Sequence, residues 1–170
     1  CSALPGFARL TDKVVGAYMS YEFHKVFPSL HNFCVTTMSS LYLDILKDRL
    51  YVSATDATQR RAAQTVIYRV LDGLLRLMSP VLSFTSAEAW EYLKGDGSEM
   101  PLEQSVFFAS FPAVDDINID ETLVDSWDRL LVIRSEITRV LEAARRDKVI
   151  GLSLAAELLV EVTGETAGFL

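Results

Sequence analysis

The sequence predicts an all-α protein, an antiparallel helix bundle with a short β-prone tail at its C-terminal end. Three observations carry this prediction. Apolar residues recur with a spacing close to 3.6 through most of the chain. Ser, Thr, Asp, Gly and Pro residues stand where these periodic stretches begin and end. Half of the 170 residues are apolar, which is enough to form the core of one domain.

The first half of the chain predicts three helical segments. The first covers residues 6–19, and Ser20 is the expected N-cap of the second. Pro28 removes a backbone donor from the second segment, which predicts a kink near residues 24–28. The third segment covers residues 38–49. The residues expected to face the core are Leu10, Val14, Val15 and Tyr18, then Phe23, Val26, Phe27, Leu30, Phe33 and Cys34, and finally Leu41, Ile45 and Leu46.

A long fourth helix has clear start and stop signals. Thr55 or Asp56 can cap its N-terminus, and Gln59 stands three positions after Asp56, as a capping box requires. The dipeptide Ser79-Pro80 ends it, because the residue before a proline disfavours the helical conformation. Its apolar face is expected to contain Ala63, Val66, Ile67, Val70, Leu71, Leu74, Leu77 and Met78.

A shorter helix is expected next. Thr85 and Glu88 form a second capping box, Trp90 lies on the apolar face, and Gly95 stands near the end of the helix. A loop rich in Gly, Asp and Ser follows this helix, and residues 106–111 are expected to be extended or irregular before Pro112.

The last helix is expected over residues 118–149, with Gly151 as its C-terminal stop. Beyond it, residues 158–162 are β-prone. One short strand at a chain end cannot form a sheet alone. We therefore expect a helical domain over residues 1–152 and the truncated start of a following domain over residues 153–170.

Composition and charge limit the possible functions. The formal net charge of −7 argues against a protein that binds nucleic acid over its whole surface, so an RNA-binding surface must be a local basic patch. No stretch approaches the roughly 18 apolar residues of a membrane span, and no signal-peptide pattern opens the chain. A soluble, cytoplasmic protein is expected. Two cysteines are too few for a disulfide framework. Because the chain starts at Cys1 and not at Met, we expect a piece of a longer polypeptide.

No catalytic residue, cofactor site or metal site is expected in this chain. His24 and His31 are seven residues apart, two helical turns or roughly 10 Å, which is too far for one ion. The sequence contains no Cys-x-x-Cys pair, glycine-rich phosphate loop or Gly-x-Ser-x-Gly elbow. The pair Asp115-Asp116 is interpreted as turn or capping charge.

Three basic clusters supply the candidate RNA-binding residues. Cations in the last turn of a helix oppose its macrodipole favourably, so the first and third clusters also have a purely structural explanation. That explanation fails for the second cluster, which stands near a helix N-terminus. A solvated helix face is the alternative for each of them. In chain order the clusters are Lys47 with Arg49, Arg60 with Arg61, and Arg145 with Arg146 and Lys148.

Aromatic side chains are candidates for base stacking, which is worth about 1–3 kcal/mol per base. Tyr51 is the first candidate because it leads from a basic helix end into a loop, although packing of its ring against the long helix is favoured. Trp90 and Trp127 fit apolar helix faces and are expected in the core. Further stacking candidates are Phe107, Phe108 and Phe111.

Five stretches of the chain carry family motifs in order and with natural spacing. They are residues 21–26 (YEFHKV), 31–35 (HNFCV), 41–51 (LYLDILKDRLY), 77–90 (LMSPVLSFTSAEAW) and 141–156 (LEAARRDKVIGLSLAA). Together they resemble the helical anticodon-binding domain of class I isoleucyl-tRNA synthetases of the bacterial type, over most of residues 10–157. The chain departs from the family at Pro28 and at residues 36–38, where the family usually has Asn-Asp-Leu.

The resemblance implies a module that grips the anticodon stem-loop of tRNA(Ile) in an isoleucine–tRNA ligase, next to other domains of that synthetase. It also implies a monomeric cytoplasmic parent enzyme that uses ATP and Mg, with Zn in the Cys-rich tail of many bacterial members. The His-x-Gly-His and Lys-Met-Ser-Lys-Ser motifs are absent from this chain, so we expect no catalysis from it. Phosphate contacts are expected from Lys47, Arg49, Arg145, Arg146 and Lys148, a base contact from Tyr51, and secondary contacts from Arg60 and Arg61.

Two alternatives stay open. The first is the same domain of valyl-tRNA synthetase, which typically has Trp-Tyr-Leu-Glu where this chain has residues 41–44 (LYLD), and which lacks the Lys-Asp-Arg-Leu-Tyr that follows. The second is a helical protein-interaction module without RNA binding, which predicts basic clusters on unrelated faces.

Overall fold

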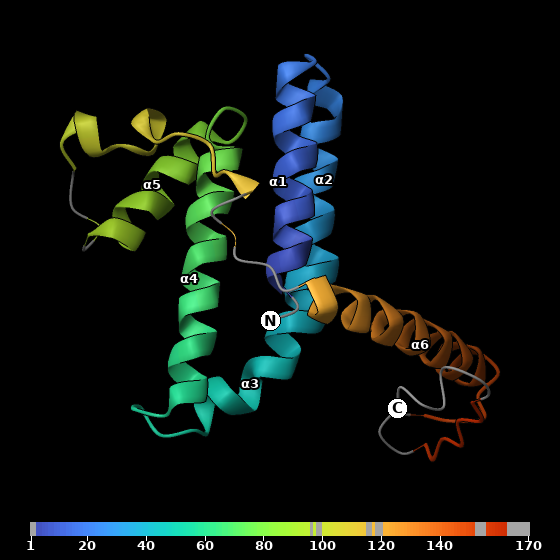
Figure 1. Cartoon of the computed structure of the whole chain (residues 1–170). Helices are drawn as coiled ribbons and strands as arrows, with labels where there is room; N and C mark the ends of the chain where they lie inside the picture. The colour runs from blue at the N-terminus through green and yellow to red at the C-terminus, as the bar shows by residue number, and fades with distance from the viewer. Residues whose placement is uncertain are drawn as a thin grey trace. The chain divides into compact units, whose positions relative to one another are not determined.

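The computed structural model describes residues 3–95, 97, 100–114, 117, 121–151 and 156–162, without the side chains of residues 121–123. It divides into two compact units, Cys1–Val124 and Asp125–Leu170, each described by itself below. Within the described residues every regular element is helical, which confirms the all-α prediction (Figure 1). Residues 156–162 of the tail form neither helix nor strand. The expected domain boundary at residues 152–153 lies outside the described residues and stays a prediction.

The first unit is built from helices that run up, down and up again (Figure 1). Its elements are α1 (Ala3–Met19), η1 (Phe23–Lys25), α2 (Val26–Asn32), η2 (Phe33–Leu43), α3 (Asp44–Tyr51), α4 (Thr58–Met78), α5 (Ser83–Lys94), η3 (Leu102–Gln104) and η4 (Val106–Phe108). The chain rises through α1, returns through α2, η2 and α3 as one nearly continuous helix, and rises again through α4. α5 packs against α4. The stretch expected to be irregular contains the short 3-10 turn η4.

Apolar side chains from α1, α2, η2, α3 and α4 form one core. Burial of a side chain of this kind is worth about 1.5–3 kcal/mol, so these contacts fix how the helices of the unit pack. The largest fully buried apolar side chains are Leu77, Val14, Val26, Val70 and Val106. The predicted apolar faces are confirmed for most residues. The exceptions, which are exposed, are Phe23, Phe27, Ile45 and Leu71.

The helical segment from Phe23 to Tyr51 combines three kinds of helix, which explains why the predicted apolar face does not continue to Ile45. It opens with the 3-10 turn η1, continues as α2 from Val26, and widens into the π-helix η2. A π-helix closes its hydrogen bonds to the fifth residue, so a face read with a period of 3.6 does not continue through it to Ile45. Pro28 lies in the first turn of α2, where its missing donor has no helical partner. Cys34 is half-buried against the core.

The predicted capping boxes do not form. α4 and α5 begin after Ala57 and Leu82, and neither residue makes a side-chain capping bond. Asp56 lies in the turn before α4, and Thr85 lies inside α5, so the predicted caps were wrong. The predicted ends are confirmed, because α4 stops at the Ser79-Pro80 turn and α5 stops at Gly95.

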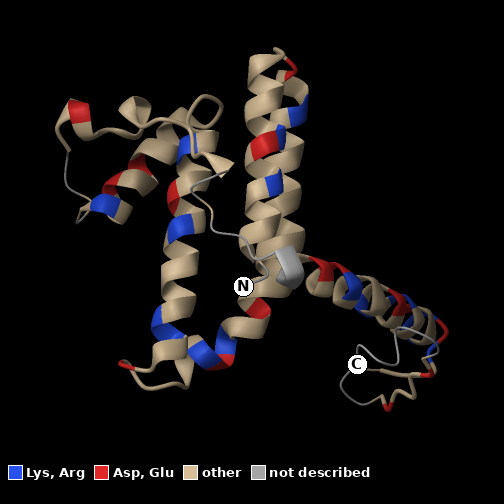
Figure 2. Cartoon of the chain, viewed as in Figure 1, with Lys and Arg blue, Asp and Glu red and all other residues tan. Residues whose placement is uncertain are grey.

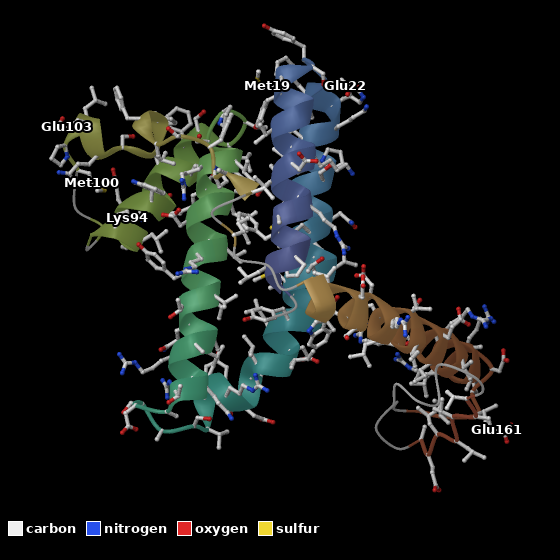
Figure 3. All side chains as sticks on the ribbon, viewed as in Figure 1. Met19, Glu22, Lys94, Met100, Glu103 and Glu161 are labelled. Atoms are coloured by element: carbon white, nitrogen blue, oxygen red, sulfur yellow. The ribbon has the colours of Figure 1, made fainter. Side chains whose placement is uncertain are left out.

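α1 ends on a residue with left-handed backbone conformation. Tyr21 has a φ of 60°, and the N–H of Glu22 donates to the carbonyl of Ala17 at 2.8 Å, as in a Schellman motif. The hydroxyl of Ser20 donates back to the carbonyl of Gly16 at 2.8 Å. Ser20 therefore closes α1, and the prediction that it caps the second helix was wrong. Figure 3 labels Met19 and Glu22 on either side of this turn.

The second unit contains most of α6 (Glu121–Arg146). The predicted start of this helix at residues 118–120 lies outside the described residues. The helix ends three residues earlier than predicted, because Lys148 has a φ of 58° and the N–H of Val149 donates to the carbonyl of Ala144 at 2.9 Å. Gly151 is therefore not the stop. Trp127 is half-buried rather than part of a core, whereas Trp90 of the first unit is buried as predicted.

Candidate nucleic-acid interface

Two of the three basic clusters meet where α3 turns into α4. Residues 52–57 reverse the chain there, and the two helices pack against each other. Figure 2 shows basic segments on both helices at this end of the unit. We call this surface the α3–α4 corner, and it consists of Lys47, Arg49, Tyr51, Arg60 and Arg61.

The turn of the corner is held by hydrogen bonds to both helices. The N–H of Val52 donates to the carbonyl of Asp48 at 2.9 Å, which ends α3. The Nη1 atom of Arg60 donates to the carbonyl of Ser53 at 2.9 Å, which ties the first turn of α4 to the loop. Arg60 is half-buried, and this contact occupies one of the hydrogen-bond donors of its guanidinium. Its role is therefore partly structural.

Lys47 is paired with a carboxylate of its own helix. Its Nζ atom lies 2.6 Å from the Oδ1 atom of Asp44, and both side chains are exposed. The hydrogen bond to Asp44 raises the pKa of Lys47 above its ordinary value. An exposed pair of this kind is weak and is screened by salt. A phosphate that approaches Lys47 must still compete with Asp44.

Arg49, Arg61 and Tyr51 are the most accessible groups of the corner. All three are exposed, and in the described part of the chain neither arginine has a carboxylate partner. The side chain of Tyr51 is 82% exposed, so the favoured packing of its ring against the long helix was wrong. Burial raises the pKa of the neighbouring Tyr42 hydroxyl, and the positive charge of Arg49 offsets part of that shift.

The corner is locally positive on an acidic chain. Residues 44–61 hold four cations against three aspartates, a net charge of +1, whereas the whole chain has −7. The three aspartates are Asp44, Asp48 and Asp56, all exposed. This stretch therefore favours anions more than the rest of the chain does, without being a strongly basic surface.

The third basic cluster belongs to the second unit and is described by itself. The Nη1 atom of Arg145 lies 2.9 Å from Glu142, and the Nε atom of Arg146 lies 3.8 Å from Asp147. Lys148 is exposed and is itself the left-handed residue that follows the end of α6. All three cations thus gather at the C-terminal end of one helix, where they also oppose its dipole.

The three candidate phenylalanines lie far from the corner. The ring of Phe111 stacks on Tyr18, with 5.3 Å between ring centroids and 6° between the planes. The hydroxyl of Tyr18 donates to the carbonyl of Leu77 at 2.9 Å, near the C-terminal end of α4. α4 spans 21 residues, or about 30 Å, and the corner is at its other end. Phe107 and Phe108 are exposed but do not extend the corner.

An ionic cluster around the buried carboxylate of Asp72 joins α4 to α5. The carboxylate of Asp72 accepts a hydrogen bond from the Nη2 atom of Arg76 and pairs with the Nζ atom of Lys94 at 2.5 Å. Lys94, at the C-terminal end of α5 (Figure 3), also donates to the hydroxyl of Tyr68 at 2.9 Å and lies 4.7 Å from the ring centroid of Trp90. Burial lowers the pKa of Lys94, but its hydrogen bonds to Asp72 and Tyr68 outweigh this effect and raise it. The cluster fastens two helices together.

Neither a metal-binding cluster nor a membrane-spanning helix occurs among the described residues. No group of three or more His, Cys, Asp or Glu side chains among them is arranged to hold a metal ion. His24 and His31 are both exposed, and His31 stacks on Phe27. Of the helices described, none has the length and apolar character needed to cross a bilayer.

Comparison with known proteins agrees with these features. A family model for the anticodon-binding domain of tRNA ligase matches residues 3–160. The isoleucine–tRNA ligase of Desulfotalea psychrophila is 57% identical over 168 residues, which cover 99% of this chain and 18% of that protein. The isoleucine–tRNA ligase of Carboxydothermus hydrogenoformans is 45% identical with the same coverage, and that of Syntrophotalea carbinolica is 48% identical over 93% of this chain and 16% of its own length. The chain thus spans less than a fifth of the length of these relatives. It belongs to the family of anticodon-binding domains of tRNA ligases.

Proposed function

We propose that this chain binds the anticodon stem-loop of tRNA(Ile) as one part of an isoleucine–tRNA ligase. The α3–α4 corner meets backbone phosphates and places Tyr51 beside an unpaired base. This grip directs the distant acceptor end of the tRNA to the active site of the parent enzyme. There, other domains carry out aminoacylation with ATP and Mg. The parent enzyme is a cytoplasmic monomer in this proposal.

One observation carries the proposal. Arg49 and Arg61 stand at one end of the first unit with the exposed aromatic ring of Tyr51, the last residue of α3, on a chain that is otherwise acidic. Unpaired loop bases present their flat faces and their hydrogen-bonding edges, and proteins recognise them by stacking and by polar contacts. The cations supply the contacts to the backbone that fix the register of the RNA.

The contribution of Tyr51 has a defined magnitude. Loss of one stacked base costs about 1–3 kcal/mol, or roughly 5- to 150-fold in affinity. Tyr51→Ala should therefore weaken binding within this range. Tyr51→Phe keeps the ring and is the matched control, so it should bind nearly as well as the unchanged protein. Equal loss in both variants would point to the hydroxyl rather than to stacking.

The central experiment titrates the 170-residue chain with tRNA(Ile) and with the same tRNA carrying a different anticodon, at two salt concentrations. We expect weak binding with a strong salt dependence and a preference for the isoleucine anticodon. Arg49→Gln with Arg61→Gln should reduce affinity, whereas Arg69→Gln, an exposed arginine elsewhere on α4, is the control. Equal affinity for both tRNAs would refute the proposal that the chain recognises the anticodon. Unchanged affinity of the double variant would show that the α3–α4 corner does not bind the tRNA.

The cluster at the end of α6 is tested separately. Arg145→Ala with Arg146→Ala should weaken tRNA binding without loss of helicity, because both side chains are exposed or half-exposed and neither is part of a core. An unchanged affinity would exclude this cluster while leaving the corner in place.

A further inference from the structure

A groove of about 470 Å³ lies between α1 and the facing helical segment of α2 and η2. Arg9 and Lys13 line it on the α1 side, and Asn32 and Thr37 line it on the other side. Sequence reasoning overlooked Arg9 and Lys13, because they are single cations beside an apolar stripe and not a cluster in the sequence. Their spacing of four residues was the available signal.

The charge of this groove is opposite to that of the chain. None of its lining residues is Asp or Glu, in a chain that has 23 of them. Arg9 and Lys13 lie on the same face of α1, about 6 Å apart along the helix axis. Lys13 is exposed, and no carboxylate of the described residues pairs with it. The groove therefore attracts anions.

Polar groups of the facing segment add hydrogen-bond donors. The Oδ1 atom of Asn32 accepts a hydrogen bond from the hydroxyl of Thr36 at 3.0 Å, which leaves its amide hydrogens for another partner. The groove is also shaped by close packing. A Cβ atom at Gly6 would stand 3.4 Å from both the ring of Phe33 and the methyl group of Thr37, so the lack of a side chain there allows the two walls to approach.

We propose that this groove binds the phosphate backbone of an RNA stem, as a second contact with the tRNA that the α3–α4 corner holds. The proposal rests on the proposed function for the identity of the RNA. Thr37 of the groove and Arg49 of the corner are twelve residues apart on a continuous helical segment. That separation is roughly 18 Å along the helix axis. One stem-loop is long enough to reach both. Because phosphate contacts carry no sequence information, the groove positions the stem and does not read it.

The test combines three RNAs with variants that change the charge of the groove. Lys13→Gln removes a cation and Thr37→Asp adds a carboxylate, while Thr37→Asn is the neutral control for the second site and Arg69→Gln is the control for the first. The RNAs are tRNA(Ile), the same tRNA with another anticodon, and an RNA duplex without a loop. Binding is measured over a series of salt concentrations, and circular dichroism checks the fold of every variant.

Lys13→Gln should weaken binding to all three RNAs by the same factor, about three- to tenfold, and should lower the slope of log K against log[salt] by about 0.7–0.9, the value for one lost phosphate contact. Thr37→Asp should act in the same direction, and both controls should bind like the unchanged protein. Unchanged affinity and slope for folded Lys13→Gln would overturn the proposal that the groove binds RNA, even if the corner variants still lose binding. If the chain fails to distinguish the two anticodons but Lys13→Gln still weakens binding to the duplex, the groove stands and the proposed function does not.

Discussion

Replacement of Asp72 by asparagine tests how α5 is fastened to α4. Asp72 is 8% exposed and pairs with both Arg76 and Lys94, whose side chains are only 28% and 29% exposed. Asp72→Asn removes the charge at nearly constant volume and leaves two partly buried cations without their carboxylate partner. Breaking a buried pair in this way costs about 3–5 kcal/mol. Both cations are partly exposed, so the expected loss lies below that range, at about 2–3 kcal/mol.

Chemical and thermal unfolding followed by circular dichroism measure this loss. For a chain of this size, 1 kcal/mol corresponds to about 2–4 °C in Tm, so we expect a decrease of about 4–12 °C. Lys94→Met removes one of the stranded cations. The double variant Asp72→Asn with Lys94→Met should therefore be more stable than the sum of the single effects predicts. A loss below about 0.5 kcal/mol for Asp72→Asn, or strict additivity in the cycle, would refute the role of this cluster.

The same cluster has a signed pH dependence. The folded pKa of Lys94 is raised above its ordinary value of 10.5. The stabilisation from its charge is therefore fully present below pH 10.5 and is lost as the pH rises through the folded pKa. Unfolding at pH 9 and pH 11.5 should show a decrease in stability that is smaller in Lys94→Met. An equal decrease in both proteins would mean that other groups cause it.

Three further substitutions or reactions test single features of the fold. Lys148→Gly should stabilise the end of α6 by about 0.5–1 kcal/mol, because the left-handed conformation costs a residue with a side chain about 1–2 kcal/mol and the lost dipole interaction offsets part of the gain; denaturation measures this. Gly73→Ala should cost about 1–2 kcal/mol because its Cβ would stand 2.2 Å from the ring of Phe7. The matched control Gly16→Ala, which meets nothing within 4 Å, should stabilise by up to about 1 kcal/mol. Burial raises the pKa of the Cys34 thiol, so a thiol reagent at pH 7.5 should react more slowly with the folded chain than with the chain in denaturant.

The helices of the first unit and the stops of α4 and α5 were predictable from the sequence, whereas the starts of α4 and α5 and the end of α6 were not. A spacing of 3.6 identifies α1 and α4 because packing against a core demands it, and Ser79-Pro80 ends α4 for local steric reasons. The capping boxes failed because the side chain of a cap adds little to a helix whose apolar face already fixes its position, as the start of α4 after Ala57 illustrates. Left-handed residues such as Tyr21 and Lys148 carry no sequence signal.

Part of the candidate site was predictable for a similar reason. The clusters at Lys47 and Arg61 meet because only a short turn joins α3 to α4, and a short connection makes neighbouring helices antiparallel. The exposure of Tyr51 was missed because an aromatic ring after an apolar helix usually finds a packing partner. The groove beside Lys13 was missed because its cations stand singly in the sequence and its opposite wall comes from α2 and η2.

The ion pairs of the basic clusters predict an order of importance for RNA binding. Lys47 and Arg145 each have a carboxylate three residues earlier on the same helix, so a phosphate must displace Asp44 or Glu142 before it gains the full charge. Arg49 has no such competitor among the described residues. Arg49→Gln should therefore reduce affinity for tRNA more than Lys47→Gln does, and Asp44→Asn should strengthen binding by releasing Lys47. These three affinities can be measured side by side at one salt concentration. If Lys47→Gln has the larger effect, Asp44 positions the lysine for the phosphate and does not compete with it.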